Sequence, residues 1–233
     1  MAIKSEIQDG VTRIKLMRPP VNAFDGLMVE ALREAFEVAD PSLPIVLTGS
    51  GGKAFSAGVD TDFFAAASPQ ERGDMVRGIT RMTGAILSHR SPVIAAINGH
   101  ALGGGFVLML CCDVRLAVND PQIKLGIPEA KAGIPFPSGP REIIRETLPV
   151  DLLRKLALTG RSMSPAELLE LGVIDALSGP ADLAATAAMR AKALAIQPGF
   201  AAVKRQIRGP LAGQVRKLAE AAHEPYLKAF NAV

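Results

Sequence analysis

The chain has 233 residues, of which 48% are hydrophobic and 21% charged, and its formal net charge is +3. This size fits one large domain, or one domain with a small appendage, and the composition is that of an ordinary globular protein. Aromatic residues make up only 4% of the chain, which disfavours a module that stacks nucleic-acid bases. The longest apolar run, residues 101–112, is too short to cross a bilayer.

The elements of the first half alternate between strands and helices. Alternating polar and apolar residues around Asp9-Gly10 predict a β-hairpin. Two short apolar runs, residues 44–49 and 92–98, predict buried strands, and a glycine-rich segment follows each. Helical spacing of apolar residues or a helix-start signal predicts helices at residues 26–38 and 68–87, and a short helix ending near residue 110. Two further strands are expected on either side of a turn at residues 119–121.

From residue 137 onward the pattern is almost wholly helical. The expected helices cover residues 137–147, 151–158, 165–171, 181–195, 200–207 and 213–230. Short strands are expected near residues 159–163 and 173–176. The sequence therefore predicts an α/β core followed by helices.

The two cysteines, Cys111 and Cys112, are adjacent in an apolar stretch. Neighbouring cysteines cannot form an ordinary disulfide framework, so we expect buried free thiols in a reducing compartment. The first ten residues contain no apolar segment of the kind found in secretory signal peptides. We therefore expect a cytoplasmic protein without a membrane or nucleic-acid partner.

The glycine-rich segments do not fit the nucleotide-binding motifs. A phosphate-binding loop needs a hydroxyl residue after Gly-Lys, and Ala54 follows Gly52-Lys53. The triplet at residues 103–105 lacks the last glycine of the dinucleotide fingerprint. Ser56 lies in a stretch that resembles a nucleophile elbow, but no histidine is an evident partner for it. A small loop residue is the favoured interpretation of Ser56.

A third interpretation takes the two segments together. Each follows a buried strand and precedes a helical pattern, so each can direct backbone N–H groups outward. Two such groups can converge on one oxygen and form an oxyanion hole, and glycine lets a ligand approach the backbone closely. The chemistry that this arrangement favours is formation of an enolate or of a tetrahedral intermediate.

Four segments carry a family resemblance: KAFSAGVD, INGHALGGG, CCDVRLA and GIPEAKAGIPF. In this order and spacing they resemble the enoyl-CoA hydratase/isomerase (crotonase) superfamily, over roughly residues 11–206. The closest motif match is to the 3,2-enoyl-CoA isomerases that use a single glutamate. The resemblance implies an α/β fold of repeated β-β-α units, residues 1–190, and a helical region, residues 191–233, for oligomerisation and pocket closure. It also implies an acyl-CoA thioester substrate, no separate cofactor, no metal, and a homotrimer or a dimer of trimers.

The resemblance assigns roles to particular positions. The backbone N–H groups of Val59 and Gly104 correspond to the oxyanion hole. The backbone around Lys53, Ala54, Phe55 and Ala57 would hold the adenine and pantetheine of CoA. Asp60 is expected to cap the next helix, and Asp113 matches an aspartate with a structural role.

The reaction depends on the acids present. Hydratases of the family hold a water between two glutamates; Glu129 matches one of them, but Val107 stands at the position of the other. A valine cannot hold a water or move a proton. One carboxylate is enough to move a proton from C2 to C4 of a thioester, and isomerases of the family resemble this chain at Glu129, at the apolar Val107 and in the apolar turn that ends at Phe136. The sequence therefore favours a 3-enoyl-CoA to 2-enoyl-CoA isomerase.

Several alternatives stay open at this point. Hydration or decarboxylation could run on the same scaffold, and a non-catalytic CoA-ester-binding subunit is the alternative of another class. Glu129 could also be a solvated carboxylate at a helix start. Asp62 stands where many family members carry a lysine, and the C-terminal residues lack the usual family signature, so the resemblance leaves the acyl chain undefined.

Overall fold

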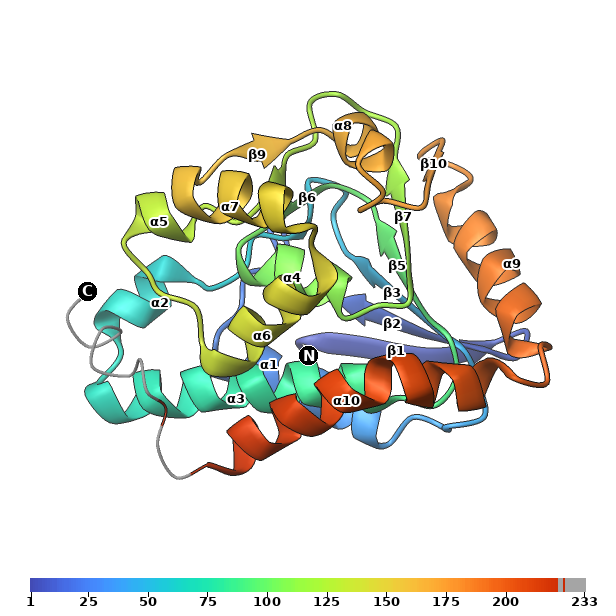
Figure 1. The fold of residues 1–233 in the computed structure, drawn as a ribbon, viewed down its shortest axis with the longest axis horizontal. Helices are drawn as coiled ribbons and strands as arrows, with labels where there is room; N and C mark the ends of the chain where they lie inside the picture. The colour runs from blue at the N-terminus through green and yellow to red at the C-terminus, as the bar shows by residue number, and fades with distance from the viewer. Residues whose placement is uncertain (222–223, 225–233) are drawn as a thin grey trace.

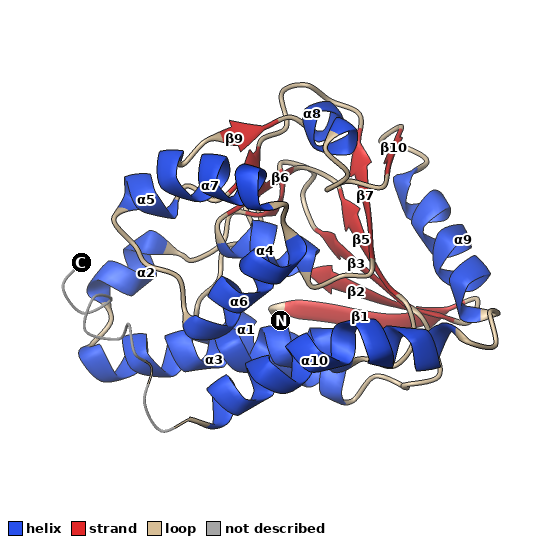
Figure 2. Cartoon of the chain, in the orientation of Figure 1, coloured by secondary structure: helices blue, strands red, loops and turns tan. Residues whose placement is uncertain are grey.

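The computed structural model describes residues 1–221 and residue 224. Within this part of the chain, two β-sheets are surrounded by helices (Figure 1, Figure 2). The larger sheet contains, in spatial order, β1 (Ile3–Gln8), β2 (Val11–Leu16), β3 (Ile45–Gly49), β5 (Val93–Ile97), β7 (Val114–Val118) and β10 (Ala176–Ser178). The smaller sheet contains β4 (Ala54–Ser56), β6 (His100–Leu102), β8 (Leu125–Gly126) and β9 (Ser162–Met163).

From β3 to β8, successive strands alternate between the two sheets, and a helix follows each pair. The pair β3–β4 precedes α2 (Thr61–Ala66) and α3 (Pro69–Ser88), β5–β6 precedes α4 (Gly104–Leu110), and β7–β8 precedes α5 (Glu129–Ala132). The strands β2, β3, β5 and β7 run parallel to one another, as the connections through helices require. This order is the expected β-β-α repeat, and it brings the starts of three helices to one region of the molecule.

The N-terminal hairpin forms as predicted. Gln8 pairs with Val11 in the antiparallel register, and the two turn residues Asp9 and Gly10 both have positive φ, at 52° and 74°. Two-residue turns of this kind match the twist of the flanking strands.

The remaining helices cover the sheets and the rest of the core. They are α1 (Gly26–Glu37), α6 (Ser138–Thr147), α7 (Val150–Thr159), α8 (Pro165–Glu170), α9 (Leu183–Ala195) and α10 (Phe200–Glu220). Helix α10 packs along α3 and also contacts α6, whereas α9 packs on the strands of the larger sheet (Figure 2). The expected boundary after residue 190 falls inside α9 and stays a prediction.

Two expectations about local structure are wrong. The helices expected at residues 200–207 and 213–230 are one continuous helix as far as Glu220, with Pro210 inside it, because packing on α3 and α6 outweighs the one backbone hydrogen bond that a proline removes. The rest of the second expected helix lies outside the described residues. The two glycine-rich segments, interpreted from the sequence as loops between a strand and a helix, also contain β4 and β6, which are too short to show a periodicity.

A buried ion pair joins α10 to the core. The Nζ of Lys204 lies 2.6 Å from Oδ2 of Asp113 and donates to the carbonyl of Ser91, and the same carboxylate oxygen accepts from the backbone N–H of Val93. Arg208 donates from the same helix to the carbonyls of Leu110 and Cys111, at the end of α4. The sequence prediction of a structural Asp113 agrees with these contacts.

We expect Lys204→Met to lower the free energy of unfolding by about 3 kcal/mol, because it leaves the Asp113 carboxylate buried without an opposite charge. The two side chains are only 7% and 9% exposed. Urea unfolding measures the change, and the double variant Lys204→Met/Asp113→Asn should recover part of it. An unchanged unfolding midpoint in the single variant would contradict a contribution of this pair.

Cys111 and Cys112 are buried free thiols, as expected. Burial raises the pKa of both thiols well above neutral pH, so neither is a thiolate under ordinary conditions. No helix in residues 1–221 combines the length and the apolar character needed to cross a membrane.

Candidate active site

A mainly apolar cavity of about 120 Å³ lies where the starts of α2, α4 and α5 meet. It brings together six of the residues singled out in the sequence: Ala57, Val59, Gly104, Val107, Glu129 and Phe136. Its other walls come from α2, α3, the turn between α5 and α6, and the first turn of α6. They include Thr61, Phe64, Val76, Ile79, Ile134, Pro135, Pro137 and Pro140.

Glu129 is the polar group that dominates this cavity. It is the first residue of α5, which Pro128 precedes, and its Oε2 atom is buried without a hydrogen-bond partner among the described residues. Burial raises the pKa of the Glu129 carboxyl from 4.5 to about 7, because the surrounding apolar groups disfavour the charged form. These features do not fit a solvated carboxylate at a helix start.

Gly103 lets the Glu129 carboxyl lie against the start of α4. A Cβ at Gly103 would lie 3.1 Å from Oε1 of Glu129, and the backbone there has a φ of 55°, which glycine adopts readily. The loop that precedes α2 also lies against the start of α4, since a Cβ at Gly58 would lie 2.6 Å from the backbone nitrogen of Gly104. The two glycine-rich segments therefore touch directly beside the carboxyl group.

Two backbone N–H groups at this contact have no acceptor in the part of the chain that the structure describes. Val59 forms a parallel bridge with Phe24, in which the flanking groups of Gly58 and Asp60 make the hydrogen bonds. Because N–H groups on an extended chain alternate in direction, that of Val59 points away from Phe24. Gly104 begins α4, and the first N–H groups of a helix have no partner inside it. Neither N–H donates a hydrogen bond found among residues 1–221 and 224.

Arg18 braces the segment that carries Val59, and the sequence reasoning missed it. Its guanidinium contacts Oδ2 of Asp25 at 3.2 Å and Oδ2 of Asp60 at 2.9 Å. These two aspartates cap the N-termini of α1 and α2, as expected for Asp60. The backbone N–H of Phe63 and the cation of Arg18 hold the pKa of Asp60 below its usual value. The only signal for this role in the sequence was an arginine close to two aspartates that could cap helices.

Three of the candidate CoA-binding residues lie away from the cavity. Lys53 lines a different hollow of about 780 Å³, together with Gly52 and His100. Ala54 and Phe55 are buried, and their carbonyls accept hydrogen bonds from the side chain of Asn22. Contact of these three residues with CoA stays a prediction.

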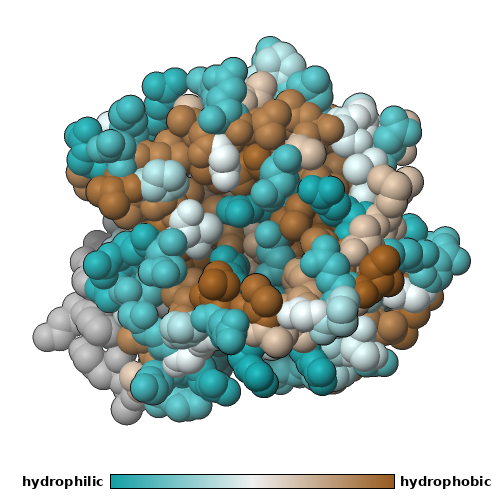
Figure 3. All heavy atoms as spheres, turned by 45° about the vertical axis from the view of Figure 1, so that its right-hand side comes forward, coloured by the Kyte–Doolittle hydropathy of each residue, from teal (hydrophilic) through white to brown (hydrophobic). Residues whose placement is uncertain are grey.

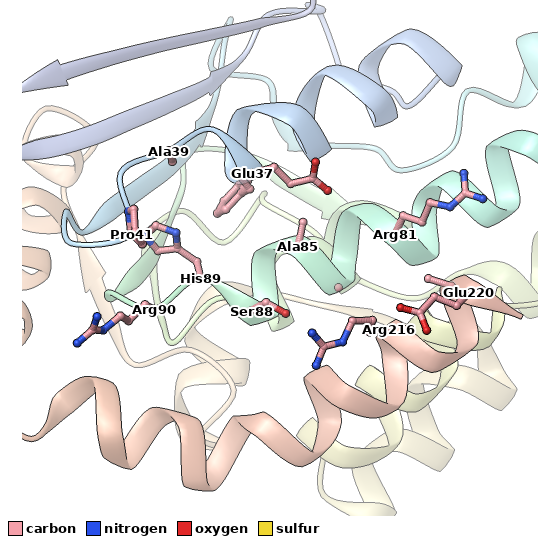
Figure 4. A pocket seen from close by; sticks show the side chains of 13 residues that line it. Glu37, Ala39, Pro41, Arg81, Ala85, Ser88, His89, Arg90, Arg216 and Glu220 are labelled. Carbon is pink, nitrogen blue, oxygen red and sulfur yellow. The ribbon is translucent and has the colours of Figure 1, made fainter.

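A third hollow, of about 490 Å³, lies between α1, α3 and α10 (Figure 4). Arg81 and Ser88 of α3 line it, with Arg216 and Glu220 of α10 (Figure 4). None of the residues singled out for the site lies there. Within residues 1–221 and 224, no three His, Cys, Asp or Glu side chains are grouped in a way that could hold a metal ion.

Comparison with known proteins agrees with this fold. Residues 6–231 match the family model described as enoyl-CoA hydratase/isomerase, and the chain belongs to this family. A relative from Salmonella arizonae, named carnitinyl-CoA dehydratase, is 36% identical over 176 residues. That match covers 74% of this chain and 66% of the relative, just under two thirds of the relative's length.

Solved structures confirm the crotonase-like fold. An apo structure described as an enoyl-CoA isomerase of Mycobacterium tuberculosis is 25% identical, with a TM-score of 0.85, and the match covers 98% of both chains. A second structure of that mycobacterial protein, described as a probable enoyl-CoA hydratase, is 26% identical, with a TM-score of 0.85 and 94% coverage of both chains. The names of the similar proteins thus include an isomerase, a hydratase and a dehydratase, so the reaction must be argued from the site.

Proposed function

We propose that this protein is an acyl-CoA double-bond isomerase that converts a 3-enoyl-CoA into a 2-enoyl-CoA. Glu129 is the sole acid and base, and the N–H groups of Val59 and Gly104 form the oxyanion hole. The observation that carries the proposal is a single desolvated carboxyl, with a pKa of about 7, in a cavity where the described residues supply no second acid.

The proposed reaction needs one proton acceptor and one site for negative charge. The Glu129 carboxylate takes a proton from C2 of the substrate, and the electron pair of that bond moves into a dienolate whose negative charge lies on the thioester oxygen. The two N–H groups stabilise this oxygen; one donor of an oxyanion hole typically contributes about 2.7–4 kcal/mol. The carboxylic acid then returns the proton to C4, which leaves the double bond between C2 and C3.

The raised pKa of Glu129 supports both halves of this cycle. A group with a pKa near the working pH is present as a base in a useful fraction and is also acidic enough to return the proton. Val107 supports the choice of isomerisation over hydration, because its buried side chain lines the cavity and offers no atom that can hold a water.

Hydration or dehydration is the second candidate, and the name of the Salmonella relative favours it. It requires a water positioned by groups other than a second carboxylate of the described cavity. A non-catalytic CoA-ester-binding subunit is the candidate of another class. All three share an acyl-CoA ligand, with no cofactor beyond the CoA that the ligand carries.

The proposal includes a cytoplasmic homotrimer or dimer of trimers. Apolar side chains are exposed on the side of the molecule that carries α9 and α10 (Figure 3), among them Met189, Ile196, Val203 and Ile207. Such groups are typical of surfaces that pack against another copy of a chain.

We expect purified protein to convert a 3-hexenoyl-CoA into its 2-enoyl isomer without a change of mass. Ultraviolet absorbance follows formation of the conjugated thioester, and mass spectrometry detects a hydrated product from 2-hexenoyl-CoA. Faster hydration than isomerisation would contradict the proposal in favour of a hydratase. Loss of carbon dioxide from a malonyl-type thioester as the main reaction would favour a decarboxylase, and binding without any reaction would favour the non-catalytic subunit.

A further inference from the structure

We infer that the cavity selects short, apolar acyl groups of about four to six carbons, and that Val76 and Ile79 of α3 set this limit. The inference rests on the proposed function in that it takes the cavity as the acyl site. It adds a substrate class and the residues that determine it.

The volume of the cavity carries the first step. An apolar protein cavity of about 150 Å³ holds one benzene ring, which has six carbons. The cavity beside Glu129 measures about 120 Å³. The thioester end of a substrate has to lie at the N–H groups of Val59 and Gly104, so the remaining space accepts only a few further carbons.

Helix α3 closes the cavity at a fixed place. Val76 and Ile79 are three residues apart and therefore project from the same face of the helix. Both line the cavity, and they are only 1% and 4% exposed. On another side of α3, a Cβ at Gly78 would lie 3.1 Å from Cγ1 of Val29 in α1, so α1 supports α3 from behind.

Helix α6 packs closely on α3 beside this wall. A Cβ at Gly139 would lie 2.7 Å from Cγ2 of Thr80, so the first turn of α6 packs directly on α3. Pro140, in the same turn, lines the cavity. A longer chain that extends toward this contact would have to separate these two helices, which loses close contacts of the core.

Helix α2 forms a side wall that is tied to α3. Phe64 lines the cavity, and the guanidinium of Arg72 lies 5.3 Å from the centre of its ring. Arg72 also donates to the carbonyls of Ala65 and Ala67. Because one side chain of α3 contacts both the ring and the end of α2, this wall is braced against α3.

The chemistry of the lining restricts the acyl group further. Apart from Glu129 and Thr61, the described side chains that line the cavity are apolar. A charged or strongly polar substituent would be buried there without a partner, which is unfavourable by several kcal/mol. The site therefore fits a plain alkyl end.

The test measures binding and turnover against chain length. Saturated acyl-CoAs from four to twelve carbons are titrated by calorimetry, and 3-enoyl-CoAs of matching length are assayed for isomerisation. We expect binding and kcat/KM to be highest at four to six carbons and to fall at least tenfold by ten carbons, since one methylene in an apolar pocket changes kcat/KM by about 10–200-fold.

Ile79→Ala should open the wall and raise binding and kcat/KM for the ten-carbon substrate at least tenfold relative to the four-carbon substrate. Ile86→Ala is the matched control, because Ile86 is a buried residue of the same helix but does not line the cavity. It should lower stability and leave the length profile unchanged.

The two proposals fail in different ways. A length profile that is flat in the unchanged protein, or one that Ile79→Ala shifts no more than Ile86→Ala does, overturns the inference even if isomerisation is found. Binding that falls with length, without isomerisation at any length, overturns the proposed function and supports the inference.

Discussion

Glu129→Gln should lower kcat for isomerisation by about 10²–10⁴-fold, the range that a general acid–base group contributes. Glutamine has nearly the shape of glutamate but cannot take the C2 proton, and it keeps the cavity filled. Binding of a saturated acyl-CoA should therefore stay nearly unchanged. Single-turnover kinetics with a 3-enoyl-CoA, together with calorimetry on the saturated ester, separates the two effects.

The matched control for this variant is Glu146→Gln. Glu146 is an exposed residue of α6 that does not line the cavity, so its substitution should leave both kcat and binding unchanged. A Glu129→Gln variant that isomerises at the rate of the unchanged protein would exclude Glu129 as the base. A loss of activity accompanied by a comparable loss of binding would mean that Glu129 acts mainly on affinity.

The raised pKa of Glu129 gives this variant a second signature, in stability. Below pH 4.5 the carboxyl is protonated in both the folded and the unfolded chain, so it contributes no difference. Between pH 4.5 and about 7 the unfolded chain ionises while the folded chain keeps the proton, which lowers stability as the pH rises. Above pH 7 the loss levels off at roughly 3 kcal/mol, because each pKa unit corresponds to about 1.4 kcal/mol.

Glu129→Gln should therefore stabilise the fold at pH 8 and have little effect at pH 4.5, as measured by urea unfolding at both values. If Glu129→Gln changed the free energy of unfolding by the same amount at both pH values, burial of the carboxyl would not be the cause of a raised pKa. The same titration predicts that kcat/KM of the unchanged protein rises with pH up to about 7 and then levels off.

Sequence patterns predicted the strands of the larger sheet better than those of the smaller one. Residues 44–49 and 92–98 are apolar runs bounded by turn residues, and β3 and β5 lie within them. The strands β4 and β6 have three residues each, too few for any periodicity. These strands form because the fold pairs them with other segments of the chain, and a local sequence pattern does not contain that pairing.

The identity of the candidate site residues could be predicted, but their environment could not. Glu129 and Val107 follow from the family resemblance. The desolvation of the Glu129 carboxyl depends on cavity walls that include Phe64 and Ile79, far away in the chain. The limit on chain length likewise depends on the contact of Thr80 with Gly139, which brings together two helices with no common sequence signal.

Gly105→Ala should lower the free energy of unfolding by more than about 4 kcal/mol, or prevent folding. An added Cβ would lie 2.1 Å from the carbonyl oxygen of Ser56 and 2.7 Å from its carbonyl carbon. Backbone atoms cannot rotate away as a flexible side chain can, so β4 and α4 would have to separate. Strain of this size belongs to the small class of very destabilising substitutions.

Gly213→Ala is the matched control. Gly213 lies inside α10, and a Cβ there would meet no atom within 4 Å, so alanine should stabilise the helix by up to about 1 kcal/mol. Urea unfolding, with circular dichroism to detect any failure to fold, compares the two variants. An unfolding midpoint of Gly105→Ala equal to that of the unchanged protein would contradict the close approach of β4 and α4.

This close approach links the stability of the fold to the proposed chemistry. Gly105 allows α4 to begin against Ser56 of β4, so that Gly58, two residues further along, reaches the backbone of Gly104. Only at that separation can the N–H groups of Val59 and Gly104 face one substrate oxygen. A Gly105→Ala protein that still folds should therefore lose isomerisation more strongly than acyl-CoA binding. The shifted N–H groups would weaken stabilisation of the dienolate more than they weaken binding of the substrate in its ground state.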